Sequence, residues 1–256
     1  MIQAKVEEGL AILTLDRAEA ANALSNELIE KAVQVLQEWH ESQSIKAVII
    51  TGSGDRVFCA GADLKERAGM NPDEVRAAVK NIRNFIEKVY EMPQPVIAAI
   101  NGAAIGGGVE LALACDFRIA VQYATFSLAE TGLGIIPGAG GTQRLPRLIG
   151  EQKAKELILT GKKISAEEAV YSGLVLKAFS RSELLPEAEH FARIIASRAP
   201  LANRYAKSAI NQGLQKTLQE GLQVEQAEYE KTINTKDRLE GLAAFKEKRP
   251  PVFRGE

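Results

Sequence analysis

Cysteine and histidine are scarce in this sequence of 256 residues. The two cysteines, Cys59 and Cys115, are too few for a disulfide framework, and we expect both to be buried free thiols. The two histidines, His40 and His190, fall in expected helices and lie far in sequence from the glycine-rich turns discussed below. This placement argues against a His-dependent catalytic triad and a His-rich metal site, so we expect no metal centre.

An excess of charge of one sign is also absent. The 32 lysines and arginines nearly balance the 33 aspartates and glutamates, so the overall charge attracts neither nucleic acid nor an anionic membrane. No apolar run is long enough to cross a bilayer, and the N-terminus lacks the basic-then-apolar plan of a signal peptide. We expect a globular protein of the cytoplasm, or of an organelle matrix if a presequence has been removed, with no membrane partner.

Hydrophobic periodicity predicts an α/β core followed by helices. Strand-like runs occupy residues 2–7, 10–16, 47–52, 95–100, 117–121, 125–128 and 175–179. Helices are expected at 25–41, from 71 onward, and at 109–114, 142–149, 151–159 and 169–172. Beyond a change of character near 180–200, the remaining segments are all helical: 182–198, 201–213, 217–232 and 236–248. We therefore predict a core over residues 1–195 and a helical C-terminal region over residues 196–256.

Two glycine-rich turns, each beside a glutamate, are the most informative feature of the sequence. The first spans residues 100–110 and ends at Glu110, and the second spans residues 129–141 and contains Glu130. Glycine lets a backbone approach a ligand closely, and two carboxylates beside one bound molecule can serve as acid and base. A helix that starts at the first turn would present free N–H groups to an oxyanion, and the loop 59–63 could supply a second donor.

Other interpretations of these turns have less support. No clean G-x-G-x-x-G has an acid at the right distance downstream, and no Gly-Lys-Ser/Thr follows, so neither a dinucleotide fingerprint nor a P-loop is present. A single glycine-rich turn could serve packing alone. Glu110 or Glu130 alone could be an exposed or helix-end acid. The occurrence of both turns with both acids favours a functional site.

Three stretches around these turns, residues 58–65, 100–116 and 136–146, resemble the enoyl-CoA hydratase/isomerase (crotonase) superfamily. The likeness covers nearly the whole chain, and residues 59–68 and 235–251 are most similar to the AU-rich-RNA-binding methylglutaconyl-CoA hydratase group. The resemblance implies an α/β fold of repeated ββα turns and a helical C-terminal region that builds a trimer, with two trimers commonly stacked as a hexamer. It implies an acyl-CoA thioester substrate, with coenzyme A as part of the substrate and no separate cofactor.

The resemblance also implies a role for each motif residue. The N–H groups of Ala62 and Gly107 would form an oxyanion hole. Glu110 would activate water, Glu130 would deliver a proton to the α-carbon, and the Gly138 N–H would position the water. Because both acids flank the same water, the identity of the pair is better defined than the division of the acid and base roles between them. Further substrate-binding candidates are Ala60, Asp63, Leu64, Lys65 and, from the tail of a neighbouring subunit, Phe245 and Lys248. Positive charge for coenzyme A could come from Lys65, Arg67, Lys248 and Arg249, which could equally be solvated surface charges.

The presence of both glutamates favours an enoyl-CoA hydratase acting on a short-chain 2-enoyl-CoA, as in fatty acid β-oxidation, because isomerases of the superfamily often lack one acid. The alternatives are methylglutaconyl-CoA hydratase, enoyl-CoA isomerase and a non-enzymatic oligomeric scaffold. The carboxylate on the acyl chain of methylglutaconyl-CoA would need a cation in the pocket, and the sequence does not identify one. Residues 22–41 match the lysine-rich helix of RNA-binding relatives but hold one lysine and four glutamates, so we expect little nucleic acid binding. Trp39 in this segment is expected to pack rather than to stack on bases.

Overall fold

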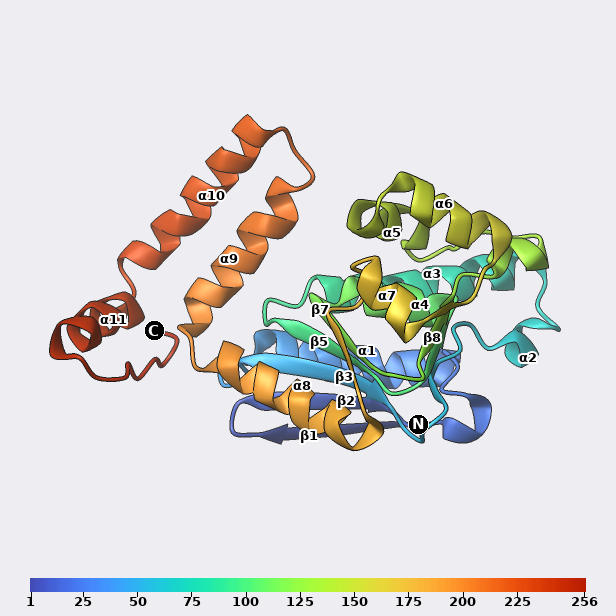
Figure 1. Cartoon of the computed structure of the whole chain (residues 1–256), viewed down its shortest axis with the longest axis horizontal. Coiled ribbons are helices and arrows are strands. Elements are labelled where there is room, and N and C mark those ends of the chain that lie inside the picture. Colours follow the sequence, from blue (N-terminus) through green and yellow to red (C-terminus); the bar gives the residue numbers. More distant parts are fainter.

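Two β-sheets form the centre of the molecule (Figure 1). The computed structural model describes residues 1–256. The larger sheet is parallel except for the antiparallel β1–β2 hairpin, and its order is β1 (Ile2–Glu7), β2 (Leu10–Leu15), β3 (Ala47–Gly52), β5 (Val96–Ile100), β7 (Phe117–Val121) and β10 (Lys177–Phe179). The smaller sheet contains β4 (Val57–Cys59), β6 (Ala103–Ile105), β8 (Thr125–Ser127) and, antiparallel to β8, β9 (Ile164–Ser165).

Successive strands alternate between the two sheets. β3, β5 and β7 lie in the larger sheet, and each is followed by a short strand, β4, β6 or β8, in the smaller sheet. A helical segment then follows each pair of strands. This arrangement confirms the expected repeat of ββα turns and places the loops that follow β4, β6 and β8 beside one another.

Eleven α-helices surround the sheets, and none of them is both long and apolar enough to cross a membrane. Ser25, Asn71 and Ser165 cap α1, α3 and α7 through their side chains, as the sequence predicts. The helices of the core are α1 (Asn26–Glu41), α2 (Leu64–Arg67), α3 (Pro72–Tyr90), α4 (Gly107–Ala114), α5 (Gly141–Ile149), α6 (Glu151–Thr160), α7 (Ala166–Tyr171) and α8 (Arg181–Ala196). The 3-10 helices are η1 (Ala18–Ala20) and η2 (Glu130–Leu133).

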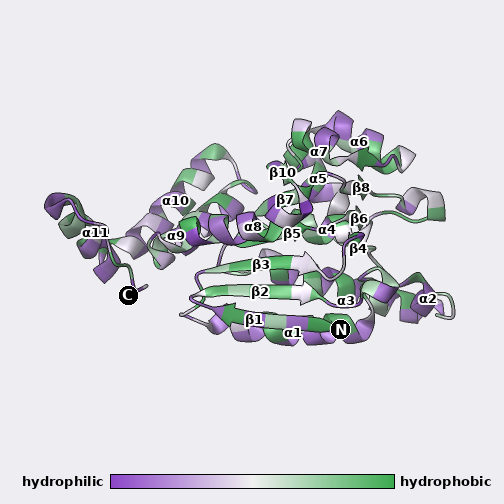
Figure 2. Ribbon diagram, turned by 60° about the horizontal axis from the view of Figure 1, so that its bottom comes forward, coloured by the Kyte–Doolittle hydropathy of each residue, from purple (hydrophilic) through white to green (hydrophobic).

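The larger sheet is covered on both faces. α8 packs against its strands in front, and α1 lies behind them in the view of Figure 1. β3 and β5 are buried along their whole length, which explains why their sequences are continuous apolar runs. Hydrophobic residues dominate β2 and β3 in Figure 2. Trp39 is buried at the inner face of α1, which confirms its packing role.

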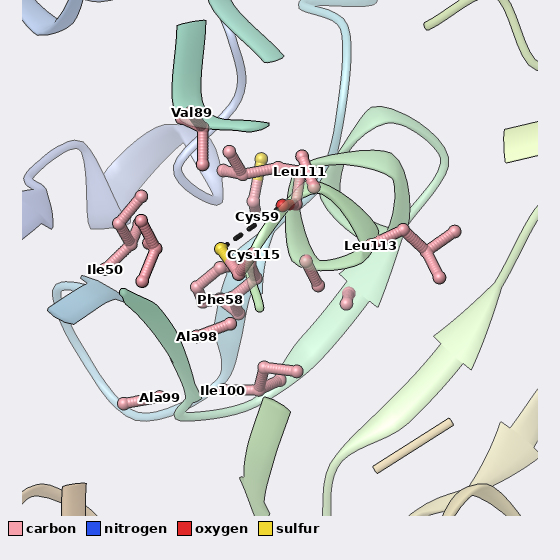
Figure 3. Packing of buried hydrophobic residues seen from close by; sticks show 14 of the residues in the cluster. Ile50, Phe58, Cys59, Val89, Ala98, Ala99, Ile100, Leu111, Leu113 and Cys115 are labelled. Carbon is pink, nitrogen blue, oxygen red and sulfur yellow. Dashed lines mark hydrogen bonds between the residues drawn. The ribbon is translucent and has the colours of Figure 1, made fainter. Parts of the chain in front are cut away.

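The core behind the first glycine-rich turn is closely packed (Figure 3). Every residue of α4 is buried, and Cys59 and Cys115 lie among apolar side chains as free thiols, as expected. Burial raises the pKa of each thiol to about 12. Since the thiolate is the reactive form, neither cysteine is a nucleophile near neutral pH.

Three C-terminal helices extend away from the sheets: α9 (Pro200–Gly213), α10 (Leu218–Ile233) and α11 (Lys236–Glu247) (Figure 1). The ammonium of Lys207 on α9 pairs with Asp116 at 2.7 Å, and Arg204 donates to the Ser42 carbonyl at 2.8 Å. These bonds join α9 to the core. Apolar side chains nevertheless remain exposed on this region: Ile210, Leu214, Leu218, Leu222, Tyr229, Leu239, Leu242 and Phe245.

The observed elements differ from the expected ones mainly at short segments. α7 begins at Ala166, three residues before its expected start at 169, and β10 begins at Lys177, two residues after its expected start at 175. β4, β6, β9 and α2 were not expected, because segments of two to four residues carry too little periodicity to be recognised.

Candidate active site

The loop after β4 and the turn before α4 lie in direct contact. Gly61 has a φ of +78°, and a Cβ built on it would lie 2.7 Å from the Gly107 nitrogen. A Cβ built on Gly108 would lie 2.0 Å from the carbonyl oxygen of Cys59, and one on Gly107 would lie 3.7 Å from the Ala62 nitrogen. Only glycines permit this approach, and it brings the amides of Ala62 and Gly107 together.

Both amides are available to a ligand. The Ala62 N–H donates to no protein acceptor, although the neighbouring Gly61 carbonyl accepts from Leu24 N at 2.7 Å. Gly107 is the first residue of α4, so its N–H has no acceptor in the helix. The N-terminal end of α4 carries a partial positive charge. A carbonyl oxygen that gains negative charge would be stabilised between these two donors.

Glu110 joins the two glycine-rich turns. Its side chain leaves the first turn of α4, the residue is 3% exposed, and Oε1 accepts from Ala139 N at 2.7 Å and from Gly141 N at 2.8 Å. Burial raises the pKa of this carboxyl above its ordinary value, while the two amides and then the charges of Arg144 and Arg83 oppose that rise. The site therefore holds Glu110 in one orientation and partly offsets the cost of its negative charge.

Glu130 is the first residue of η2, and its side chain lies against the first glycine-rich turn. Its Oε1 lies against Gly106, where a built Cβ would be 2.9 Å away, and its Oε2 is buried without a protein hydrogen-bond partner. Burial raises the pKa of Glu130, its own backbone N–H lowers it, and the nearby charge of Glu110 raises it further. A buried carboxyl oxygen without a partner is rare in folded proteins and indicates a position for hydrogen bonding to a bound molecule.

One cavity of about 1760 Å³ contains both carboxylates and the expected oxyanion hole. Its lining includes these residues predicted from the sequence: Ala60, Ala62, Leu64, Gly107, Glu110, Glu130 and Gly138. The convergence of residues 110 and 130 with the amides of residues 62 and 107 is thus present in the structure. It arises from loops that the fold places side by side.

Four other predicted substrate-binding residues do not line this cavity. Asp63 is buried, caps α2 and pairs with Arg17 at 2.6 Å, a structural arrangement. Lys65 is exposed on α2. Phe245, which is 87% exposed, and Lys248 lie at the end of α11, outside the cavity of their own chain.

Five arginines line the cavity, and the sequence analysis gave none of them a catalytic role: Arg67, Arg83, Arg118, Arg144 and Arg147. Arg83 donates from Nε and Nη2 to the Gly138 carbonyl at 3.0 and 2.9 Å. Arg144 donates to the Ala139 carbonyl at 3.2 Å and pairs with Glu87 at 2.7 Å. Arg67 of α2 forms no ion pair, and burial lowers its pKa. Arg144 lies in a motif stretch, but Arg83 has no local signal, because its partner is 55 residues away.

A family model, related sequences and solved structures all relate this chain to enoyl-CoA hydratases. Residues 5–256 match the family model described as enoyl-CoA hydratase/isomerase. The Bacillus subtilis protein YngF, named for the same activities, is 53% identical over 97% of this chain and 95% of its own length, and the mouse mitochondrial methylglutaconyl-CoA hydratase is 46% identical over 97% and 80%. The crystal structure of an enoyl-CoA hydratase from Bacillus anthracis has a TM-score of 0.98 at 54% identity, covering 100% of this chain and 99% of that one.

The chain belongs to the enoyl-CoA hydratase/isomerase family and has the crotonase fold, as the motif stretches predict. Members of this family act on acyl-CoA thioesters. The helical C-terminal region expected from the resemblance is also present.

Proposed function

We propose that this protein is an enoyl-CoA hydratase that adds water across the 2,3-double bond of a short-chain 2-enoyl-CoA thioester. The observation that carries the proposal is the presence of Glu110 and Glu130 in one cavity with the amides of Ala62 and Gly107. An isomerase moves one proton between two carbons and can do so with a single acid-base group. Hydration needs a base for water and an acid for carbon, and this cavity holds two carboxyls.

The surroundings of the two carboxyls support different roles. Glu110 accepts two amide hydrogen bonds and has two arginines nearby, so it is the better placed of the pair to be ionised and to take a proton from water. Glu130 has one oxygen without a protein partner, and the charge of Glu110 raises its pKa. Glu130 is therefore the better placed of the pair to hold a proton. Environments that push two carboxyls apart in pKa assign an acid and a base.

The proposed hydration moves protons between water, the two glutamates and the α-carbon. Glu110 removes one proton from water, and the remaining hydroxyl forms a bond to the β-carbon. The electron pair of the double bond moves toward the thioester, where the N–H groups of Ala62 and Gly107 meet the charge on oxygen. Glu130 donates its proton to the α-carbon, which yields a 3-hydroxyacyl-CoA. Transfer of a proton from Glu110 to Glu130 restores the starting state.

Methylglutaconyl-CoA is the second candidate substrate. The 46% identity to a methylglutaconyl-CoA hydratase favours it, and Arg67 now offers a cation without an acid partner at the wall of the cavity. The same guanidinium could instead meet a phosphate of coenzyme A. Steady-state kinetics on crotonyl-CoA and 3-methylglutaconyl-CoA, with the wild type and Arg67→Met, would separate the two: a loss confined to the second substrate assigns Arg67 to the acyl carboxylate.

Loss of the enoyl absorbance of crotonyl-CoA on addition of protein tests the reaction itself. We expect Glu130→Gln to lower kcat by about two orders of magnitude or more, the usual contribution of acid-base catalysis. Glu38→Gln, which alters an exposed glutamate of α1, is the matched control and should retain full activity. An activity of Glu130→Gln within a few-fold of wild type would remove Glu130 from the mechanism.

We also propose that the protein works as a homo-oligomer, a trimer or two stacked trimers, in the cytoplasm or an organelle matrix. Phe245 and Lys248 are remote from the cavity of their own chain, so they can contact coenzyme A only in a neighbouring subunit. RNA is not a proposed partner, since the one lysine of α1, Lys31, is paired with Glu27 at 2.7 Å. A salt-sensitive, submicromolar complex with AU-rich RNA would overturn this expectation.

A further inference from the structure

The peptide unit between Gly138 and Ala139 is hydrogen-bonded on both sides to charged groups. Its N–H, on Ala139, donates to Glu110 Oε1 at 2.7 Å. Its carbonyl, on Gly138, accepts two hydrogen bonds from the guanidinium of Arg83, at 3.0 Å from Nε and 2.9 Å from Nη2. A cation and a carboxylate are thus connected through a single planar amide.

Hydrogen bonds from Arg83 to the Gly138 carbonyl strengthen the hydrogen bond that the Ala139 N–H donates to Glu110. A cation bound to a carbonyl oxygen draws electron density from the amide, which makes the N–H a better donor, and hydrogen bonds in chains reinforce one another in this way. The two bonds from one planar guanidinium also fix the orientation of the peptide plane. The orientation of that plane sets where the Ala139 N–H holds Glu110.

Arg83 differs in this respect from the other arginine near Glu110. Arg144 also binds a backbone carbonyl, but its charge is matched by Glu87 at 2.7 Å, and its guanidinium lies 4.7 Å from the centre of the Tyr90 ring. Arg83 is exposed and forms no ion pair with any acid of the chain, so no carboxylate of the protein offsets its charge at the Gly138 carbonyl.

We propose that Arg83 is a positioning residue for the base of the reaction and acts on Glu110 through the peptide unit that joins Gly138 to Ala139. This inference rests on the proposed function for its kinetic consequence. The hydrogen-bonded connection between Arg83 and the carboxyl of Glu110 does not depend on which reaction is catalysed.

The charged groups around Glu110 determine the direction of the expected effect. Arg144 and Arg83 favour its ionised form, and the charge of ionised Glu110 in turn raises the pKa of the facing Glu130. Without Arg83, the pKa of Glu110 rises, because a favourable charge and a polarised donor are both lost. The base is then protonated at a higher pH, and the acid limb of the kcat/KM profile moves upward in pH.

Three variants test this inference. Arg83→Met removes the donors and keeps an aliphatic side chain, and Arg83→Lys keeps the charge but not the two-point bond. Arg76→Met alters an exposed arginine two turns earlier on α3 and serves as the matched control. Circular dichroism melts establish that each variant is folded. Carboxyl ¹³C signals in glutamate-labelled protein, with Glu110 assigned by the signal lost in Glu110→Gln, follow the titration without any need for activity.

We expect Arg83→Met to raise the titration midpoint of Glu110, to move the acid limb of kcat/KM upward, and to lower kcat about ten-fold with KM within about two-fold, on the scale of one hydrogen bond to a charged group. Arg83→Lys should fall between Arg83→Met and wild type, and Arg76→Met should match wild type. An unchanged Glu110 titration in Arg83→Met, or equal effects of the Arg83 and Arg76 variants, would overturn the inference. If Arg83→Met shifts the Glu110 titration but the wild type does not hydrate crotonyl-CoA, only the proposed function is wrong.

Discussion

Glu110 and Glu130 have the same side chain but are stabilised differently. Glu110 is held by the amides of Ala139 and Gly141, whereas Glu130 Oε2 has no protein partner. Burial raises the pKa of both residues. Ionisation of the half-buried Glu130 is therefore a cost to folding, and such costs are common at positions with a proposed chemical role.

The raised pKa of Glu130 predicts a pH-dependent gain in stability when its charge is removed. In the unfolded chain this carboxyl ionises near 4.5, and in the folded chain it ionises at higher pH. Between the two values the folded state binds more protons, so folding stability falls as pH rises through that window. We expect Glu130→Gln to melt at a higher temperature than wild type at pH 8, with a smaller difference at pH 5.

Thermal unfolding followed by circular dichroism at the two pH values checks this expectation. Glu38→Gln supplies the comparison, because that glutamate is exposed and should give no pH-dependent difference. A gap between Glu130→Gln and wild type that is equal at pH 5 and pH 8 would show that burial of the charge is not the cause.

At the scale of elements, the start of α4 depends on the absence of side chains. A Cβ built on Gly108 would lie 2.0 Å from the carbonyl oxygen of Cys59 at the end of β4, whereas one on Gly69, after α2, meets no atom within 4 Å. We expect Gly108→Ala to lower the free energy of unfolding by about 1–3 kcal/mol, the usual cost of overpacking, and to separate the amides of Ala62 and Gly107. Gly69→Ala should stay within about 0.5 kcal/mol of wild type.

Urea unfolding and the crotonyl-CoA assay on both glycine variants give the measurement. Gly108→Ala should lose activity as well as stability, since its added methyl group displaces the turn that carries Gly107. Full activity in a stable Gly108→Ala variant would contradict the close contact between this turn and the end of β4.

Long elements were predictable from the sequence, whereas several of the shortest ones were not. β3 and β5 are continuous apolar runs, and α1 and α3 carry capping residues, so each was identified from local pattern. β4 and β6 have three residues each and are stabilised by pairing within the smaller sheet, β4 with β6 and β6 with β8. Pairing is a property of the folded chain, and no local pattern encodes it.

The same distinction applies to the site. The two glycine-rich turns identified Glu110 and Glu130, and the resemblance to a family assigned a role to these residues and to Gly107. The amides that hold Glu110 lie 29 and 31 residues further along the chain, and Arg83 lies 55 residues before the carbonyl that it binds. Only the alternation of strands between two sheets brings these groups together, so the supporting residues became visible with the fold.

At the scale of the whole molecule, the C-terminal helices expose more apolar surface than a monomer needs. Leu218, Leu222 and Tyr229 form one face of α10 at helical spacing, and they are 82%, 55% and 66% exposed. Figure 2 shows hydrophobic and hydrophilic residues together along α9 and α10. Exposed apolar surface of this kind is typical of protein–protein contacts, in keeping with the homo-oligomer proposed above.

We expect light scattering after size exclusion to give three or six times the chain mass of 27.7 kDa. Leu218→Asp combined with Leu222→Asp should lower the mass, because burial of two charges without partners opposes association. It should also raise KM for crotonyl-CoA if the tail of each chain completes the coenzyme A site of its neighbour. Leu176→Asp, at a 58% exposed leucine outside this region, is the control and should keep the wild-type mass. A wild type that elutes as a folded, fully active monomer would place Phe245 and Lys248 outside the substrate site.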